Sequence, residues 1–143
     1  MSAQSLKVLI VAGGLTHERD VSVRSGRRVA NSLVNQGFAA KVVGFDQNLP
    51  SAISDFQPDV IWPLVHGSIG EDGSLQTLLE GTGIPYVGST PAQAMLDSNK
   101  PTAKALVGSA GLDTPGWIAL PQLLFRQLGA QNVLKMIEAG LTF

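Results

Sequence analysis

The feature that most restricts the fold of this chain is a nearly continuous apolar run near its start, Leu6–Ala12, which ends in Gly13 and Gly14. Apolar residues on both faces of a strand are typical of a parallel sheet that helices cover on both sides. The run and the polar residues before it are too short for a membrane span or for a complete signal peptide. The run therefore predicts a buried parallel strand in a protein of the cytoplasm.

Helical and strand patterns alternate along the rest of the chain. Residues 22–36 carry apolar or small side chains at helical spacing, and Gly37 follows at the position of a C-terminal cap. Short loops between strands and helices imply β-α-β crossovers, so the predicted fold class is α/β, with a mostly parallel, Rossmann-like sheet flanked by helices. The other predicted strands are 39–45, 60–64, 84–87 and the beginning of one at 118–120, and the other predicted helices are 74–80, 91–96, 100–110 and 123–139.

The composition is that of an ordinary globular chain. Of 143 residues, 44% are hydrophobic and 15% are charged, which excludes a disordered chain. Ten Lys and Arg residues against 11 Asp and Glu residues give a net charge of −1, so neither nucleic acid nor an anionic membrane is an expected partner. The sequence contains no Cys, which excludes disulfides and thiolate chemistry. A turn-rich stretch at 111–115 predicts one domain over residues 1–114 and the start of a further region over 115–143.

The first segment that can carry chemistry is GGLTHERDVS, residues 13–22, between the first predicted strand and helix. Its two glycines permit a close backbone approach, and the helix start, capped by Asp20 or Ser22, offers free N–H groups. The glycine spacing differs from the dinucleotide-binding pattern GxGxxG. An amino-acid-like ligand fits better, since Glu18 can pair with an ammonium group while the helix N–H groups face a carboxylate. The alternative is a solvated loop that only caps the helix.

The second segment is HGSIGEDGSLQ, residues 66–76, directly after the third predicted strand. It stands where the ligand crevice of a parallel sheet is expected. His66 can change protonation near physiological pH and donate to an anionic intermediate, or it can simply bond the backbone at the strand end. Asp72 is expected to be a helix N-cap, with Gln76 reaching back to it. The spacing of His66, Glu71 and Asp72 matches no known metal ligand set, so no metal site is predicted.

Two lysines on one predicted helix form the third candidate. Lys100 and Lys104 are four residues apart, so both lie on the same side of the helix. From there they can contact phosphate groups, or they can form the solvated side of the helix.

Three segments together resemble D-alanine–D-alanine ligases. The N-terminal domain of this family carries a GGxSxEREVS-type loop, an HGxxGEDGxxQ loop and an IPYxGS strand end, which stand here as GGLTHERDVS, HGSIGEDGSLQ and IPYVGST. The resemblance covers most of residues 6–90 and implies an α/β N-terminal domain that precedes an ATP-grasp catalytic region. It also implies a cytoplasmic, homodimeric enzyme of peptidoglycan synthesis. In such an enzyme ATP and Mg²⁺ convert the carboxylate of one D-alanine to an acyl phosphate, which the amine of a second D-alanine attacks.

The same resemblance implies roles for four side chains. Glu18 matches the glutamate that binds the ammonium group of the first D-alanine, and His66 matches the histidine near its carboxylate and the acyl phosphate. Glu71 matches a glutamate that helps to position groups of the neighbouring domain. Lys100 aligns with a lysine near the ATP phosphates, although the family usually reads Met-Asp-Lys where this chain has Ser98-Asn99-Lys100.

The similarity becomes weak after Trp117, and the sequence ends at Phe143. The resemblance therefore implies that the nucleotide-clamping strands and the metal-binding acids lie beyond this sequence, and we expect the 143-residue chain alone to be inactive. One alternative is a non-catalytic module of the same fold that binds a small ligand or dimerises. A dinucleotide-binding dehydrogenase domain is a further alternative, for which Asp46 is suitably placed after the second strand but the glycine pattern is missing.

Overall fold

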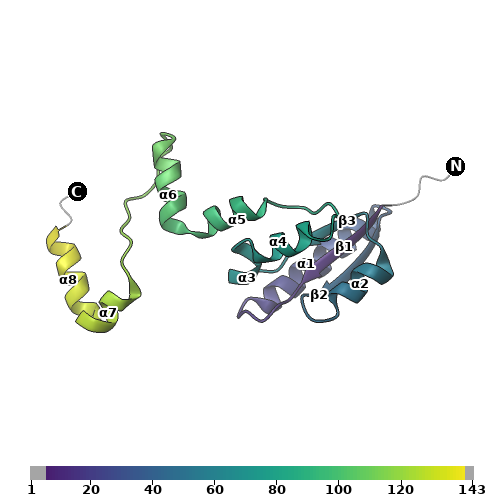
Figure 1. The fold of residues 1–143 in the computed structure, drawn as a ribbon, viewed down its shortest axis with the longest axis horizontal. Coiled ribbons are helices and arrows are strands. Elements are labelled where there is room, and N and C mark those ends of the chain that lie inside the picture. Colours follow the sequence, from purple (N-terminus) through teal and green to yellow (C-terminus); the bar gives the residue numbers. More distant parts are fainter. Residues whose placement is uncertain (1–5, 141–143) are drawn as a thin grey trace. The chain divides into compact units, whose positions relative to one another are not determined.

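The computed structural model of the protein describes residues 6–140 (Figure 1). The chain divides into two compact units, Met1–Ala103 and Lys104–Phe143, and each is described by itself. The first unit holds the sheet and both glycine-rich segments. The domain boundary predicted after residue 114 stays a prediction.

A parallel sheet forms the centre of the first unit. β1 (Lys7–Ala12) lies between β2 (Ala39–Gly44) and β3 (Val60–Pro63), and both neighbours run parallel to it. Because β1 is the central strand, every residue from Val8 to Ala12 is buried. The apolar run is therefore confirmed as a buried parallel strand, and the α/β fold class is confirmed with it.

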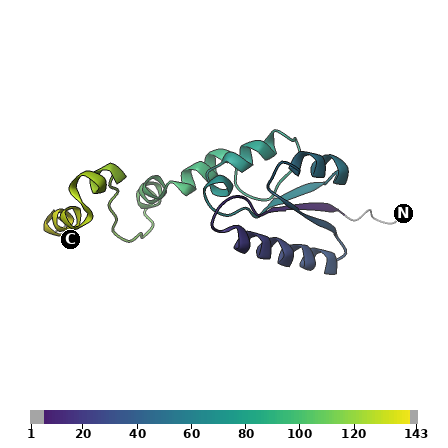
Figure 2. The same cartoon turned by 90° about the horizontal axis from the view of Figure 1, so that it is seen from below.

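Helices cover both faces of this sheet (Figure 2). α1 (Arg19–Asn35) packs on one face, where a Cβ atom at Gly26 would lie only 2.8 Å from the Cβ atom of Ala12. α2 (Leu49–Phe56) and α4 (Ser74–Glu80) cover the other face. The core on this second face joins alternate strand residues to apolar residues of the two helices: Leu9, Val11, Ile61, Leu49, Leu75 and Leu79.

The sequence patterns do not predict α2. It spans only eight residues, and Pro50 in its first turn is typical of a loop, although proline is well tolerated at that position. Leu49 is buried, and the partly buried Ile53 and Phe56 pack against the same core. This tertiary packing stabilises a helix that would be marginal on its own.

The strand predicted at 84–87 forms a single bridge to β3 rather than a ladder. The N–H group of Ile61 donates to the carbonyl of Pro85 at 2.9 Å, and the N–H group of Val87 donates to the carbonyl of Ile61 at 2.9 Å. The next donor on that side of β3 would be Pro63, which has no N–H group. The pairing stops there, so the prediction of a full fourth strand is wrong.

The remaining helices of the first unit follow the predictions closely. Those predicted at 74–80, 91–96 and 100–110 are confirmed as α4, α5 (Pro91–Ser98) and α6 (Lys100–Ser109), of which α6 runs on into the second unit.

A capping box fixes the start of α5. The hydroxyl of Thr90 accepts from the N–H group of Gln93, and the side chain of Gln93 accepts from the N–H group of Thr90. α5 packs against α4 and against α3 (Ser68–Glu71), a short helix inside the second glycine-rich segment that was not predicted.

The second unit contains α7 (Gln122–Leu128) and α8 (Ala130–Gly140) in place of the single helix predicted at 123–139. Gly129 between them has a φ of 77°, which ends α7. Residues 118–120 have no strand partner within the part of the chain that the structure describes, so that predicted strand is wrong. No helix of residues 6–140 has both the length and the apolar character needed to cross a membrane.

Candidate functional site

The two glycine-rich segments meet at the carboxyl edge of the sheet. The chain leaves β1 toward α1 on one face, and after β3 it continues to α4 on the other face. Because β1 and β3 are neighbours, the loops that follow them diverge from a shared edge. Ligands of open α/β sheets bind at such a switch point, so the topology places the candidate site here.

Ser22 joins the ends of these two strands. It is fully buried in α1, and its hydroxyl accepts from the N–H group of Gly13 at 2.7 Å and donates to the carbonyl of Leu64. The prediction that Asp20 or Ser22 caps α1 is wrong, since the N-cap residue is Glu18 and no side chain caps the helix. The hydroxyl of Ser22 instead connects the strands because the central position of β1 brings both partners within reach.

A second contact ties the two loops to each other. The hydroxyl of Thr16 donates to the carbonyl of His66 at 3.0 Å. Gly67, the next residue, has a φ of 84°, and a Cβ atom there would lie 2.9 Å from Cγ2 of Thr16. A residue with a side chain would be strained at this position and would push the loops apart. His66 is therefore the residue at which the loop after β3 is fixed to the loop after β1.

These contacts bring together three of the four predicted site residues. Glu18, His66 and Glu71 each offer one oxygen or nitrogen atom that lies within 4.8 Å of the other two. Nδ1 of His66 is 4.0 Å from Oε1 of Glu71, and the same oxygen accepts from the N–H group of Gly67 at 3.2 Å. The side chains of His66 and Glu71 are 32% and 58% exposed. Two carboxylates attract positive charge and an imidazole can donate to an anionic oxygen, so the group suits a small zwitterion from solvent.

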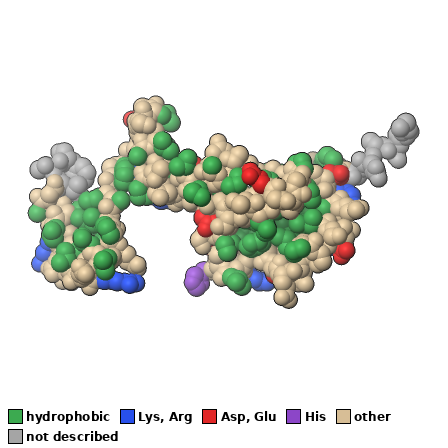
Figure 3. Space-filling view, in the orientation of Figure 1, with side chains coloured by type: hydrophobic (Ala, Val, Ile, Leu, Met, Phe, Trp, Pro, Cys, Tyr) green, Lys and Arg blue, Asp and Glu red, His purple; other side chains and the backbone are tan. Residues whose placement is uncertain are grey.

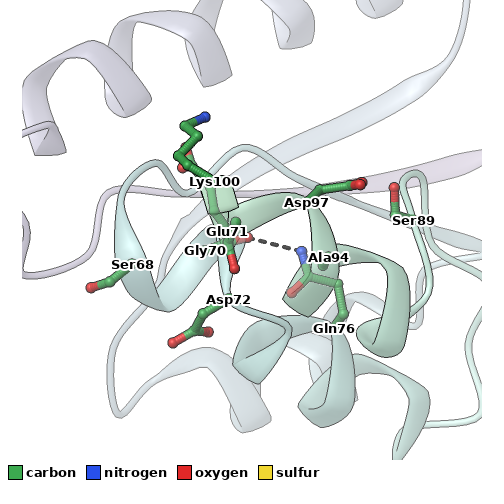
Figure 4. Close-up of a pocket in the computed structure, with 10 residues that line it drawn as sticks. Ser68, Gly70, Glu71, Asp72, Gln76, Ser89, Ala94, Asp97 and Lys100 are labelled. Carbon is green, nitrogen blue, oxygen red and sulfur yellow. Dashed lines mark hydrogen bonds between the residues drawn. The ribbon is translucent and has the colours of Figure 1, made fainter. Parts of the chain in front are cut away.

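A cavity of about 590 Å³ is also lined by Glu71, together with mostly polar residues of segments 68–76 and 89–100 (Figure 4). Lys100 lines this cavity and makes no ion pair with any of residues 6–140. Its ammonium group is available to an anion. Lys104 is different, because its Nζ atom donates to Oγ1 of Thr114 at 2.8 Å within the second unit. Lys100 and Lys104 therefore have different surroundings in the structure, although their sequence spacing predicts that they lie on the same side of the helix.

The start of α4 is held differently from the prediction. The N-cap residue is Gly73, with a φ of 91°, while the carboxylate of Asp72 accepts from the N–H group of Ser74 at 2.9 Å. This backbone hydrogen bond lowers the pKa of Asp72 below its ordinary value of 3.8. The side-chain amide of Gln76 donates to the carbonyl of Gly70 at 2.8 Å and not to Asp72. Asp72 thus orders the start of α4, which is a structural role, as the sequence predicts for this residue.

The contacts of three residues that shape the site were not predicted from the sequence. The hydroxyl groups of Thr16 and Ser22 bond to partners that follow another strand, so local spacing does not reveal them. Gly70 is packed so closely that a Cβ atom would overlap the carbonyl oxygen of Val65. The available signal was the density of glycines in the second segment, which exceeds what one turn requires.

Asp46 does not support a dinucleotide site. Its Oδ1 atom accepts from the backbone N–H and from the side-chain amide of Asn48, at 2.8 and 3.0 Å. The carboxylate therefore orders the turn before α2, and the glycine pattern that such a site needs is missing from the loop after β1.

Comparisons with known proteins point to one family. Residues 47–89 match the family model described as D-ala D-ala ligase N-terminus. The chain is 42% identical over 106 residues to the D-alanine–D-alanine ligase of Citrifermentans bemidjiense, which covers 74% of this chain and 35% of that protein. It is 34% identical over 137 residues to the D-alanine–D-alanine ligase of Pelagibacter ubique, which covers 96% of this chain and 44% of that protein. The chain thus spans less than half the length of these relatives.

Solved structures share the fold. A D-alanine–D-alanine ligase from Bacillus anthracis superposes with a TM-score of 0.74 at 24% identity, covering 96% of this chain and 43% of that chain. A structure of the ligase from the same organism complexed with ATP gives 0.71 at 22% identity, covering 94% and 54%. The VanG D-Ala:D-Ser ligase from Enterococcus faecalis gives 0.69 at 24% identity, covering 98% and 50%. At these identities the likeness shows the fold alone.

Proposed function

We propose that this chain, which carries the N-terminal domain of the D-alanine–D-alanine ligase family, forms the side of such an enzyme that binds the first D-alanine. The whole enzyme joins two D-alanines for peptidoglycan synthesis in the cytoplasm, through an acyl phosphate made with ATP. The observation that carries the proposal is the convergence of Glu18, His66 and Glu71 at the carboxyl edge of the sheet. Two separate family segments supply these side chains, and the fold brings them to one place.

The chemistry of each of the three side chains indicates its role in the proposed site. The carboxylate of Glu18 pairs with the ammonium group of the first D-alanine and orients the amino acid by charge-assisted hydrogen bonds. The imidazole of His66 donates to the substrate carboxylate and stabilises the negative charge that develops as this group is phosphorylated and then attacked. Glu71 orders the loop by accepting from Gly67 and presents its second oxygen to groups of the neighbouring domain.

Lys100 is the residue of this chain that we assign to ATP. Its side chain is exposed and lines the cavity next to Glu71. It has no ion-pair partner among residues 6–140, so its ammonium group can pair with a phosphate group.

Mg²⁺ neutralises charge on the nucleotide phosphates when it is bound. The group of three close ligand atoms in the described residues includes an imidazole, whereas Mg²⁺ prefers oxygen ligands. We therefore assign the Mg²⁺ ligands to the rest of the enzyme.

A second copy of the chain is the further partner that we propose. Hydrophobic side chains reach the surface of the first unit (Figure 3), among them Leu15, Val21 and Leu78. Exposed apolar side chains of this kind are what a homodimer interface would cover.

A chimaera tests the assignment of Glu18. The matched region of this chain replaces the corresponding region of the Citrifermentans bemidjiense ligase, and phosphate release is measured against D-alanine concentration. Loss of a hydrogen bond to a charged group costs about 1.5–3 kcal/mol, so Glu18→Gln should raise KM for the first D-alanine about ten- to hundredfold. Asp20→Asn, two residues away and exposed, is the matched control and should leave KM unchanged.

Two results would contradict the proposal. An active chimaera whose KM for D-alanine is the same with Glu18→Gln as without it would remove Glu18 from the substrate site. D-alanine-dependent phosphate release from the 143-residue chain alone would contradict the division of the catalytic groups between this chain and the rest of the enzyme.

A further inference from the structure

Gln76 is a buried residue of α4 whose side-chain amide is bonded at one end and unpaired at the other. The amide nitrogen donates to the carbonyl of Gly70 at 2.8 Å, and Figure 4 draws this bond as a dashed line. The Oε1 atom is buried and has no hydrogen-bond partner among residues 6–140. An unpaired buried oxygen lowers stability, and methionine would fill the same space without one. What the amide contributes is therefore its donor, through the bond to Gly70.

This bond fastens a short helix to the core of the first unit. α3 consists of four residues, and a helix of this length is not stable by itself. The carbonyl of Gly70 belongs to its last turn, where carbonyls have no partner within the helix, and Gln76 supplies one. α4 is firmly anchored, since Leu75 and Leu79 belong to the buried core. The position of α3 therefore depends on a side chain of α4.

The residue that follows Gly70 is Glu71, whose carboxylate belongs to the candidate site. Its Oε1 atom accepts from the N–H group of Gly67 at 3.2 Å and lies 4.0 Å from Nδ1 of His66. The side chain is exposed, so the backbone of α3 determines where the carboxylate lies. We propose that Gln76 is a positioning residue of this site, which holds the carboxylate of Glu71 in place through the carbonyl of Gly70. The part that Glu71 plays in the reaction rests on the proposed function.

NMR spectroscopy of the complete 143-residue chain tests the effect on Glu71. The amide proton of Gly67 is the reporter, because its hydrogen bond to Glu71 moves its resonance downfield. Gln76→Met removes the donor to α3, so this resonance should move upfield by about as much as it does in Glu71→Ala. Thr77→Val is the matched control, since the hydroxyl of Thr77 donates from α4 to the carbonyl of Gly73, at 2.9 Å, and not to α3. This control should leave the Gly67 resonance unchanged.

Gln76→Asn is a second variant, which keeps a polar amide at this position. Its side chain is one methylene shorter and cannot reach the carbonyl of Gly70, so the Gly67 resonance should again move upfield. The amide resonances of β1 show whether each variant keeps the sheet. A folded variant in which the Gly67 resonance does not move would overturn the proposal. Loss of the sheet in both variants would also overturn it, because Gln76 would then be a requirement of the fold itself.

The chimaera with the Citrifermentans bemidjiense ligase adds a kinetic test. A displacement of about 1 Å in a site can cost about 100-fold in rate, so Gln76→Met should lower kcat about 10–100-fold. KM for the first D-alanine should stay within about twofold, because the loop that carries Glu18 does not depend on α3. If Gln76 acts through Glu71, the double variant Gln76→Met with Glu71→Ala should be no slower than Glu71→Ala alone. Losses that multiply in the double variant would contradict the positioning role.

The two readouts separate this role from the proposed function. An unchanged kcat in Glu71→Ala would contradict the part that the proposed function gives to Glu71. A Gly67 resonance that Gln76→Met does not move would contradict the positioning role of Gln76 alone, since this measurement requires no ligase activity.

Discussion

At the residue scale, the hydroxyl group of Ser22 is the clearest case of a side chain whose role depends on its surroundings. Serine before a helical pattern suggests an N-cap, and this was the prediction. In the structure Ser22 lies in the first turns of α1, fully buried, and its hydroxyl bonds to Gly13 and Leu64 at the ends of β1 and β3. The residue type was correctly recognised as significant, but its partners depend on strand order, which no local pattern contains.

Ser22→Ala tests this role. The change leaves the buried N–H group of Gly13 and the partly buried carbonyl of Leu64 without the hydroxyl partner, at a cost of about 1–3 kcal/mol for each unsatisfied group. We expect the free energy of unfolding, measured by urea denaturation, to fall by at least about 2 kcal/mol. Ser32→Ala, exposed on the same helix, is the control and should change it by less than about 0.5 kcal/mol. Equal effects of the two changes would show that the hydroxyl of Ser22 contributes no stability.

At the element scale, predictions of strands and helices are confirmed where the packing of the element agrees with its local sequence pattern. β1, α4, α5 and α6 appear where predicted, because their residues carry both the right periodicity and recognisable ends. The ladder expected at 84–87 stops at one bridge because Pro63 on the neighbouring strand lacks a donor. α2 was not predicted because its stability comes from contacts of Leu49 with the sheet.

Gly70→Ala tests the packing of α3. A Cβ atom at Gly70 would overlap the carbonyl oxygen of Val65, so the short helix would have to move away from the end of β3. We expect a loss of about 1–3 kcal/mol in the free energy of unfolding, as for other overpacked sites. Gly108→Ala in α6 is the control, and it should change the free energy of unfolding in the opposite direction. Nothing lies within 4 Å of a Cβ atom at that position. Alanine there should stabilise the helix by about 0.5–1 kcal/mol.

At the scale of the whole molecule, the first unit contains a complete core of its own. The seven residues of its buried hydrophobic cluster all come from the sheet, from α2 and α4, and from the loop after β3. α5 adds to it by packing against α3 and α4 and by burying Ala94. We therefore expect this unit to fold independently of residues 104–143.

Two truncations test this expectation. The chain of residues 1–103 should unfold in one cooperative thermal transition, with amide NMR shifts in the sheet like those of the full chain. Residues 1–89, which lack α5, should melt at a lower temperature because the contacts of Ala94 are lost. A chain of residues 1–103 without a cooperative transition would show that the first unit requires the second.

The sequence alone determined the buried central strand, the α/β class and the family, because these depend on apolar runs and on motifs that are contiguous in the chain. It also identified Glu18, His66, Glu71 and Lys100 as candidates, first from the residues of the three segments and then, with specific roles, through the family resemblance. Only the tertiary structure decided that Glu18, His66 and Glu71 lie together and that Lys104 bonds to Thr114 instead of sharing the surroundings of Lys100. The physical reason is that distances between side chains on different elements are set by the β2-β1-β3 order and by helix packing.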